Sequence, residues 1–320
     1  MPVIASQFDP PVLIRNGHVQ TILPVLFPRR FKLVFNRTRL ELEDGDFLDL
    51  DWARGNEPRS RLAILSHGLE GGTNNGYIRG MATALNAAGW DALAWNLRGC
   101  SGEANRLPRF YHSGETGDLA KVIAHAKPAY SKIALLGFSL GGNITLKYLG
   151  EAPVDPIVVG GVGVSVPVDL AASARTLDQR WSNKIYLGRF IKTMVAKIEA
   201  KAVRFPLGLD KTTLRSVKNF RQFDDLYTAP IHGFRDAADY WAKSSARQFL
   251  PGITVPTLLV TACNDPFLSP ESFPFAEAEA NPKFYFEAPQ SGGHVGFLDL
   301  APGNQTWVER RAVQFLAELT

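Results

Sequence analysis

Cysteine and long apolar runs are scarce in this chain of 320 residues, and both shortages narrow the class of protein. Its two cysteines, Cys100 and Cys263, are too few for a disulfide framework. The N-terminal stretch MPVIASQFDPP has neither a basic start nor an apolar run long enough for a signal peptide. The best candidate for a membrane span, residues 156–167, is short and broken by three glycines. We therefore expect a soluble, cytoplasmic protein.

Patterns that bind phosphate or metal are also missing. The chain contains neither G-x-x-x-x-G-K-[ST] nor G-x-G-x-x-G, the glycine-rich patterns that bind nucleotides. A nucleotide-dependent oxidoreductase is therefore not expected. Apart from His294, the histidines show no spacing typical of a metal site, so we expect no metal and no cofactor. These histidines are His18, His67, His112, His125 and His232.

Apolar residues make up 45% of the chain, which is enough for a sizeable core in one large domain. The first 30 residues are rich in proline and are expected to be irregular. Two strands follow at 31–42 and 46–52, and the second alternates in polarity, which predicts a half-buried strand. From residue 62 onward, short apolar runs alternate with helical patterns, which is typical of a parallel sheet covered by helices. The expected strands are 62–68, 91–97, 132–139, 156–166, 255–265 and 283–289, and the expected helices are 77–88, 115–127, 140–150 and 304–319.

This alternation stops at Pro167 for about 80 residues, in which no buried strand is expected. Residues 181–203 instead repeat apolar side chains at helical spacing. We therefore predict an α/β fold with a mostly parallel sheet. Residues 1–166 and 251–320 would form its core, and residues 167–250 a helical cap inserted between two late strands.

The stretch LLGFSLGGN places Ser139 between an apolar strand and a helix. G-x-S-x-G in this context is typical of a nucleophile on a sharp turn, where Gly137 and Gly141 are needed because only small neighbours fit. The free N–H of Leu140 at the helix start would then donate to a developing oxyanion. A serine that caps a helix in a glycine-rich turn is the alternative interpretation.

A serine hydroxyl needs a base to become a nucleophile, and on this type of sheet the chain order is serine, acid, histidine. His294 lies in the glycine-rich loop SGGHVGF after the last strand. Asp265 follows a buried strand in TACNDPF, where a carboxylate can orient the imidazole. We predict the triad Ser139, Asp265 and His294. Asp169 is the rival acid, although a helix N-cap is its simpler role.

A second oxyanion donor is expected from the loop HGLEGGTNN, which follows the strand at 62–68. The N–H of Leu69 is our candidate, and His67 would then support the loop. A merely flexible glycine-rich turn is the alternative.

Several longer strings resemble the YheT-like branch of the α/β-hydrolases, a family of predicted esterases. The resemblance spans residues 14–315. It implies a carboxylic-ester hydrolase with Ser139 as nucleophile, Asp265 as acid, His294 as base, and Leu69 and Leu140 at the oxyanion hole. It does not fix the natural substrate. The strings are NGHVQTILP, HGLEGG, NLRGCSGEANRLPRFYHSGET, GFSLGGN, FDDLYTAPIHGF and ACNDPF.

Two further side chains in these strings have expected roles. Cys100 is expected to be a small buried apolar residue, with a position in the pocket lining as the alternative. His112 is expected to brace its loop and not to act in catalysis.

Positive charge is concentrated in the predicted cap. Residues 175–221 hold twelve Lys or Arg and three Asp or Glu, a net charge of +9 against +4 for the whole chain. On the helix predicted at 181–203, Arg189, Lys192 and Lys197 lie away from the apolar stripe. They fit a solvated face, a transient contact with an anionic membrane surface, or attraction of anionic substrates such as phospholipids or acyl thioesters. Three aromatic side chains fit either an acyl pocket or core packing, namely Trp181, Tyr186 and Phe190.

Together these features predict a serine carboxylesterase that forms an acyl-enzyme on Ser139. The expected substrates are small esters with short- to medium-chain acyl groups, and no nucleic-acid partner is expected. Lipase or phospholipase activity, acyl transfer and thioester cleavage by the same triad remain open. A non-catalytic binding protein on the same fold is the alternative of another class, and the intact triad argues against it. The oligomeric state is not indicated.

Overall fold

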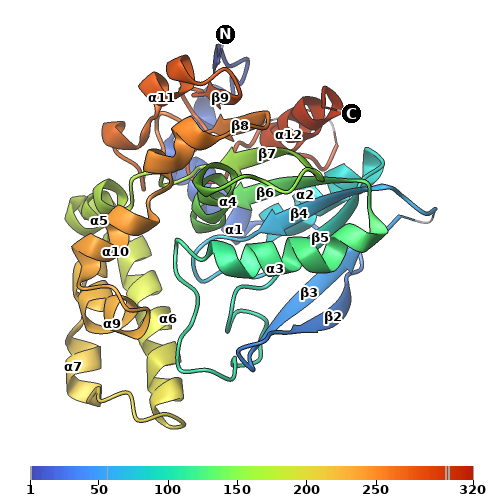
Figure 1. The fold of residues 1–320 in the computed structure, drawn as a ribbon. Helices are drawn as coiled ribbons and strands as arrows, with labels where there is room; N and C mark the ends of the chain where they lie inside the picture. Colours follow the sequence, from blue (N-terminus) through green and yellow to red (C-terminus); the bar gives the residue numbers. More distant parts are fainter. Residues whose placement is uncertain (1, 56, 300, 302, 320) are drawn as a thin grey trace.

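The computed structural model describes residues 2–55, 57–299, 301 and 303–319. Within these residues the strands are β1 (Val3–Ile4), β2 (Asn36–Glu41), β3 (Phe47–Ala53), β4 (Arg61–Ser66), β5 (Asp91–Trp95), β6 (Lys132–Phe138), β7 (Val158–Val164), β8 (Thr257–Val260) and β9 (Phe284–Glu287). They form one nine-stranded sheet in the order β1-β9-β8-β7-β6-β4-β5-β3-β2 (Figure 1). β3 runs antiparallel to both of its neighbours, β2 and β5, and the other pairs are parallel. The expected mostly parallel sheet is confirmed.

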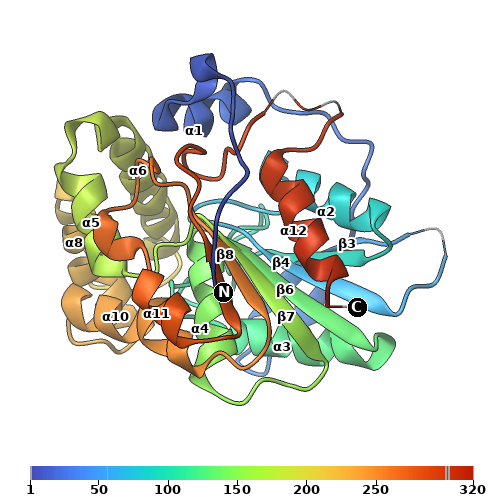
Figure 2. The same ribbon diagram turned by 90° about the horizontal axis from the view of Figure 1, so that it is seen from above.

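Helices cover both faces of this sheet. The central strands carry apolar side chains on both faces, and each face must therefore be shielded from water. Ile64 and Leu135 face a core that includes α3 (Thr116–Ala126) and α4 (Leu140–Glu151). Their sequence neighbours Leu65 and Leu136 face the opposite core, which includes α2 (Gly76–Ala87) and α12 (Trp307–Ala317). The two helix layers are seen on opposite sides of the sheet in Figure 2.

The segment between β7 and β8, residues 165–256, is described throughout and contains only helices and loops. Its α-helices are α5 (Leu170–Gln179), α6 (Lys184–Ala202), α7 (Lys211–Ser216), α8 (Phe220–Phe223), α9 (Ala229–Ile231) and α10 (Ala237–Ser244). They share an apolar cluster of their own and stand to one side of the sheet (Figure 1). The helical insertion between late strands is therefore confirmed. The helix expected from residue 181 begins at Lys184, after a 3-10 turn.

The N-terminal region is not irregular, and this expectation is wrong. β1 pairs with β9 at the sheet edge, and residues Gly17–Leu26 form the helix α1. The side chain of Asn16 caps this helix by accepting from the N–H groups of His18 and Val19. The proline content of this region suggests irregular structure, but the cap and long-range contacts stabilise a helix there.

The expectation that β3 is half buried is also wrong, because all of its residues are buried. The carboxylates on its polar side are paired with arginine side chains of the edge strand β2, whose own residues are almost all exposed. Arg39 donates to both oxygens of Asp49 at 2.8 and 3.0 Å, and Arg37 donates to both oxygens of Asp51 at 2.7 Å. Paired guanidinium groups let these carboxylates be buried on a face that the alternation in polarity predicts to be solvated.

Candidate active site

Ser139 sits at the sharp turn between β6 and α4. Its backbone has φ 52° and ψ −121°, a left-handed conformation that a residue with a side chain rarely adopts. A Cβ at Gly137 would collide with the carbonyl of Gly141, and one at Gly141 would collide with the carbonyls of Ser66 and His67. These glycines therefore let α4 pack directly against the strand ends, which fixes the position of the serine.

His294 connects Ser139 to Asp265. Its Nε2 lies 2.9 Å from the Oγ of Ser139, and its Nδ1 lies 2.8 Å from the Oδ2 of Asp265. The Asp265 side chain is fully buried, and its Oδ1 accepts from the N–H of Phe267. The structure thus brings together the three residues that the sequence predicts as a triad. Ser139 lies 155 positions before His294 in the chain, and Asp265 lies 29 positions before it. The carboxylate of Asp169 instead caps α5 by accepting from the N–H of Ala172.

The loop that carries His294 is positioned by the N-terminal helix, which sequence reasoning missed. The N–H of His294 donates to the Oγ1 of Thr21 at 2.9 Å. The next N–H in the loop, that of Val295, donates to the Oγ of Ser165 at 3.0 Å. Asn264 accepts from Gly293 and donates to the carbonyl of Arg15, so it joins the loop to the start of α1. The string NGHVQTILP contains Thr21 and was the one available signal.

The loop HGLEGG lies against the nucleophile, since a Cβ at Gly68 would be 3.2 Å from the Cβ of Ser139. Within the described residues, the N–H groups of Leu69 and Leu140 donate to no protein acceptor, and both residues border the same pocket as Ser139. His67 is fully buried beneath the loop. It donates from Nδ1 to the carbonyl of Gly68 and accepts at Nε2 from the N–H of Leu97. Burial lowers the pKa of His67 to about 4, so the ring is neutral.

A pocket extends from Ser139 and His294 into the inserted helices. Apolar and aromatic side chains dominate its walls, among them Leu177, Phe190, Met194, Phe220, Phe223 and Trp241. Of the three aromatic residues that fit either an acyl pocket or core packing, Phe190 lines the pocket, whereas Trp181 is 80% exposed and does neither. Tyr186 packs against Phe267, with ring centroids 4.8 Å apart. Two carboxyl groups border the pocket, those of Glu70 and Asp224, and burial raises the pKa of Asp224 to about 7.

Residues 64–300 match the family model described as the alpha/beta hydrolase fold. The chain is an α/β-hydrolase. It is 37% identical to "Putative esterase YheT" of Escherichia coli (strain K12), over 98% of this chain and 93% of that protein. It is 27% identical to mouse "Phospholipase ABHD3", over 98% of this chain and 79% of that protein. It is 28% identical to "Monoacylglycerol lipase" of Saccharomyces cerevisiae, over 78% of this chain and 57% of that protein.

Solved structures agree on the fold of this α/β-hydrolase. The Pyrococcus furiosus esterase Pf2001 superposes with a TM-score of 0.61 at 16% identity, covering 89% of this chain and 91% of that chain. Est1E from Butyrivibrio proteoclasticus with bound ferulic acid gives a TM-score of 0.58 at 16% identity, covering 88% and 98%. Identities this low support the architecture alone. In the described ranges, every helix of the hydrolase is too short or too polar to cross a membrane.

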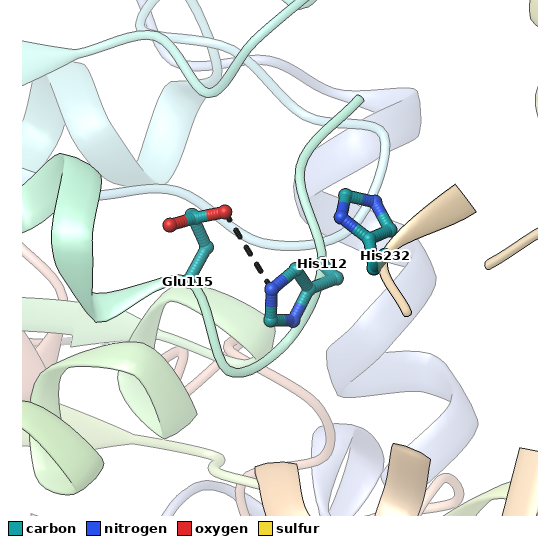
Figure 3. A group of neighbouring side chains, drawn as sticks. All are labelled: His112, Glu115 and His232. Carbon is teal, nitrogen blue, oxygen red and sulfur yellow. Dashed lines mark ion pairs between the residues drawn. The ribbon is translucent and has the colours of Figure 1, made fainter. Parts of the chain in front are cut away.

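The hydrolase also brings together three potential metal ligands that their spacing did not reveal. His112, Glu115 and His232 have ligand atoms within 4.8 Å of one another, and the two imidazoles lie near each other in Figure 3. The N–H of Gly114 donates to Nδ1 of His112, so the proton of this ring sits on Nε2, which faces Glu115 at 3.5 Å. Arg109 donates to the same carboxylate at 3.2 Å. These contacts fit a hydrogen-bonded brace, as expected for His112, and a cation would have to displace them.

The charges of α6 are only partly solvated. Arg189 and Lys192 are exposed, as expected, but the expectation for Lys197 is wrong. Lys197 borders the pocket and pairs with Glu70 at 2.8 Å. Cys100 is partly buried, and its Sγ accepts from Lys197 at 3.4 Å. Helical spacing could not show this, because Glu70 belongs to a loop far away in the sequence.

Proposed function

We propose that this α/β-hydrolase is a serine esterase that cleaves carboxylic esters through an acyl-enzyme on Ser139. The observation that carries the proposal is the position of His294, whose two ring nitrogens lie 2.9 Å from Ser139 and 2.8 Å from Asp265. A neutral imidazole placed in this way can take a proton from the hydroxyl, and the carboxylate stabilises the imidazolium that forms.

The proposed reaction has two halves. His294 removes the proton of Ser139 as Oγ attacks the ester carbonyl, and the N–H groups of Leu69 and Leu140 donate to the oxyanion. The tetrahedral intermediate collapses, His294 protonates the departing alcohol, and an acyl-enzyme remains. Water then attacks the acyl group, with His294 again as base, and Ser139 is released with the carboxylic acid.

The pocket supports an acyl chain as the part of the substrate that is recognised. Its apolar walls beyond Ser139 favour burial of methylene groups, each worth about 0.8 kcal/mol. We propose esters of short- to medium-chain acids as substrates. The relatives named as a phospholipase and a monoacylglycerol lipase make lipid esters the second candidate on the same triad. Acyl transfer and thioester cleavage require no change in the proposed residues.

The first test is labelling of the purified protein with a fluorophosphonate, with the modified residue located by mass spectrometry. We expect an adduct on Ser139 and hydrolysis of p-nitrophenyl esters, with a chain-length optimum set by the pocket. Ser139→Ala should keep the fold, lose the adduct and lower kcat/KM on the order of 10⁴-fold or more. Unchanged turnover in that variant would refute the assignment of Ser139. A native protein that forms no adduct and cleaves no ester would favour a non-catalytic binding protein.

A further inference from the structure

An ion pair joins the inserted helix α6 to the loop that carries Leu69. The Nζ of Lys197 lies 2.8 Å from the Oε1 of Glu70, and the Glu70 side chain is only 9% exposed. The same carboxylate oxygen accepts from the hydroxyl of Tyr111 at 2.9 Å. One oxygen of Glu70 therefore accepts hydrogen bonds from two groups, the ammonium group of Lys197 in the insertion and the hydroxyl of Tyr111 in the core.

Glu70 has a backbone conformation in this loop that is unfavourable for a residue with a side chain. The N–H of Gly71 donates to the carbonyl of Gly68 at 3.0 Å, which makes residues 68–71 a tight turn. Glu70 is the third residue of that turn and has φ 54°, in the region that such a turn normally gives to glycine. Its own N–H donates to the hydroxyl of Tyr111 at 2.9 Å. Side-chain and backbone contacts of Glu70 thus act together to keep an unfavourable backbone conformation.

This turn sets the direction of the N–H of Leu69. The carbonyl of Gly68 and the N–H of Leu69 belong to one planar trans peptide and point in opposite directions. That carbonyl accepts from both His67 and Gly71, so the closed turn also aims the N–H. A turn that relaxed at Glu70 would release the Gly71 bond and let the peptide rotate.

We propose that Lys197 is a positioning residue for the oxyanion hole. Through Glu70, the insertion keeps the turn at residues 68–71 closed, and the N–H of Leu69 stays directed at the reacting carbonyl. This inference rests on the proposed function, since it gives Leu69 its role there. Ester hydrolysis in this protein therefore depends on α6 being seated on the core, although Lys197 contacts no reacting atom.

A second lysine also holds α6 against the core. Because of this contact, a variant of Lys197 can test the positioning role without detaching the helix. Lys201 lies one turn further along the helix and is buried. Its Nζ donates to the carbonyl of Asn105 at 3.2 Å and to that of Leu107. Loss of Lys197 alone should therefore leave α6 in place. A buried ion pair also contributes little net stability compared with apolar side chains of similar size, so stability alone does not account for this pair.

The test compares Lys197→Met with Lys192→Met, a change of the same kind at an exposed position of the same helix. Removal of an oxyanion donor typically costs 10²–10³-fold in kcat, and a misdirected donor should cost less. We expect Lys197→Met to lower kcat roughly 10- to 100-fold with KM nearly unchanged. Its affinity for a trifluoromethyl ketone, which forms a tetrahedral adduct with the serine, should fall in parallel. Lys192→Met should stay within about twofold of the native protein, and equal kcat values for the two variants would overturn the inference.

A double variant, Lys197→Met with Glu70→Gln, controls for the unpaired carboxylate that the single variant leaves buried. Thermal unfolding should show that the double variant recovers stability, whereas its kcat should remain low. A kcat restored to the native value would show that the unpaired charge, and not the position of the turn, caused the loss. Native protein that neither cleaves esters nor forms the Ser139 adduct would instead contradict the proposed function itself.

Discussion

At the scale of single residues, two aspartates compete for the role of the acid, and their contacts differ. Asp265 touches His294, whereas Asp169 caps a helix. Asp265→Asn should lower kcat on the order of 10³-fold or more, because an amide opposite Nδ1 favours the wrong imidazole tautomer. Asp169→Asn should keep the cap and nearly all activity. Steady-state hydrolysis of one p-nitrophenyl ester by both variants shows which aspartate is the acid. A larger loss of kcat in Asp169→Asn would show that Asp265 is not the acid.

The buried ring of His67 predicts a dependence of stability on pH. Its pKa is about 4 in the folded chain, against about 6.5 when unfolded. Between these values the unfolded chain binds a proton that the folded chain does not, so stability falls as the pH decreases. The titration of His67 therefore lowers the free energy of unfolding by about 2 kcal/mol at pH 5 relative to pH 7.5.

The measurement is the free energy of unfolding by urea at both pH values, in the native protein and in His67→Gln. Other groups, such as Asp224 with its raised pKa, titrate in both proteins and cancel in the comparison. We expect the variant to lose roughly 2 kcal/mol less on acidification than the native protein. Equal losses would mean that His67 is protonated in the folded state.

At the scale of elements, α1 is a support for the active site. The hydroxyl of its residue Thr21 accepts a hydrogen bond from the N–H of His294. The loop around His294 contains two non-glycine residues with left-handed backbone conformations, Val295 and Phe297. Thr21→Val keeps the shape of the side chain but leaves the N–H of His294 unpaired, a cost of about 1–3 kcal/mol. We expect kcat to fall roughly tenfold, with Thr212→Val on the exposed face of α7 as the matched control. An unchanged pH profile and kcat would show that α1 is not needed to position His294.

Much of the architecture could be predicted from the sequence, because its signals are local. Strand runs and helical spacing depend on residues close together in the chain, and each of the three triad candidates stands in a short motif of its own. α1 was missed because its partners outside the N-terminal region, such as His294 and Leu298, lie more than 270 positions away. Lys197 was misplaced for the same reason, since the spacing of a helix shows its apolar side but not which loop approaches its polar side.

At the scale of the whole molecule, we propose that residues 167–250 act as a cap on a core of residues 1–166 and 251–320. The helices of this segment share one apolar cluster, into which only a few core residues such as Phe267 extend. The pocket lies between that cluster and Ser139. This division predicts that cap residues set which acyl group is accepted and that core residues perform the chemistry.

The exposed surface of the cap offers a test of membrane contact. Trp181 and Ile185 are 80% and 83% exposed, next to the exposed cations Arg189 and Lys192 of the same region. A Lys or Arg close to an anionic bilayer contributes about 1 kcal/mol to binding. If this surface rests on lipid, exchange of both cations for Gln should weaken binding to phosphatidylserine vesicles about tenfold or more at low salt. Equal sedimentation with vesicles before and after the exchange would support a merely solvated face.

The arginine-rich strand β2 has a consequence for association. An open sheet edge normally offers unpaired backbone groups on which another chain could add a strand. Here such an addition would bring a second polypeptide against Arg37 and Arg39, whose guanidinium groups already neutralise the carboxylates beneath them. β2 is therefore an exposed edge strand whose charged side chains protect it from pairing with the edge of another sheet.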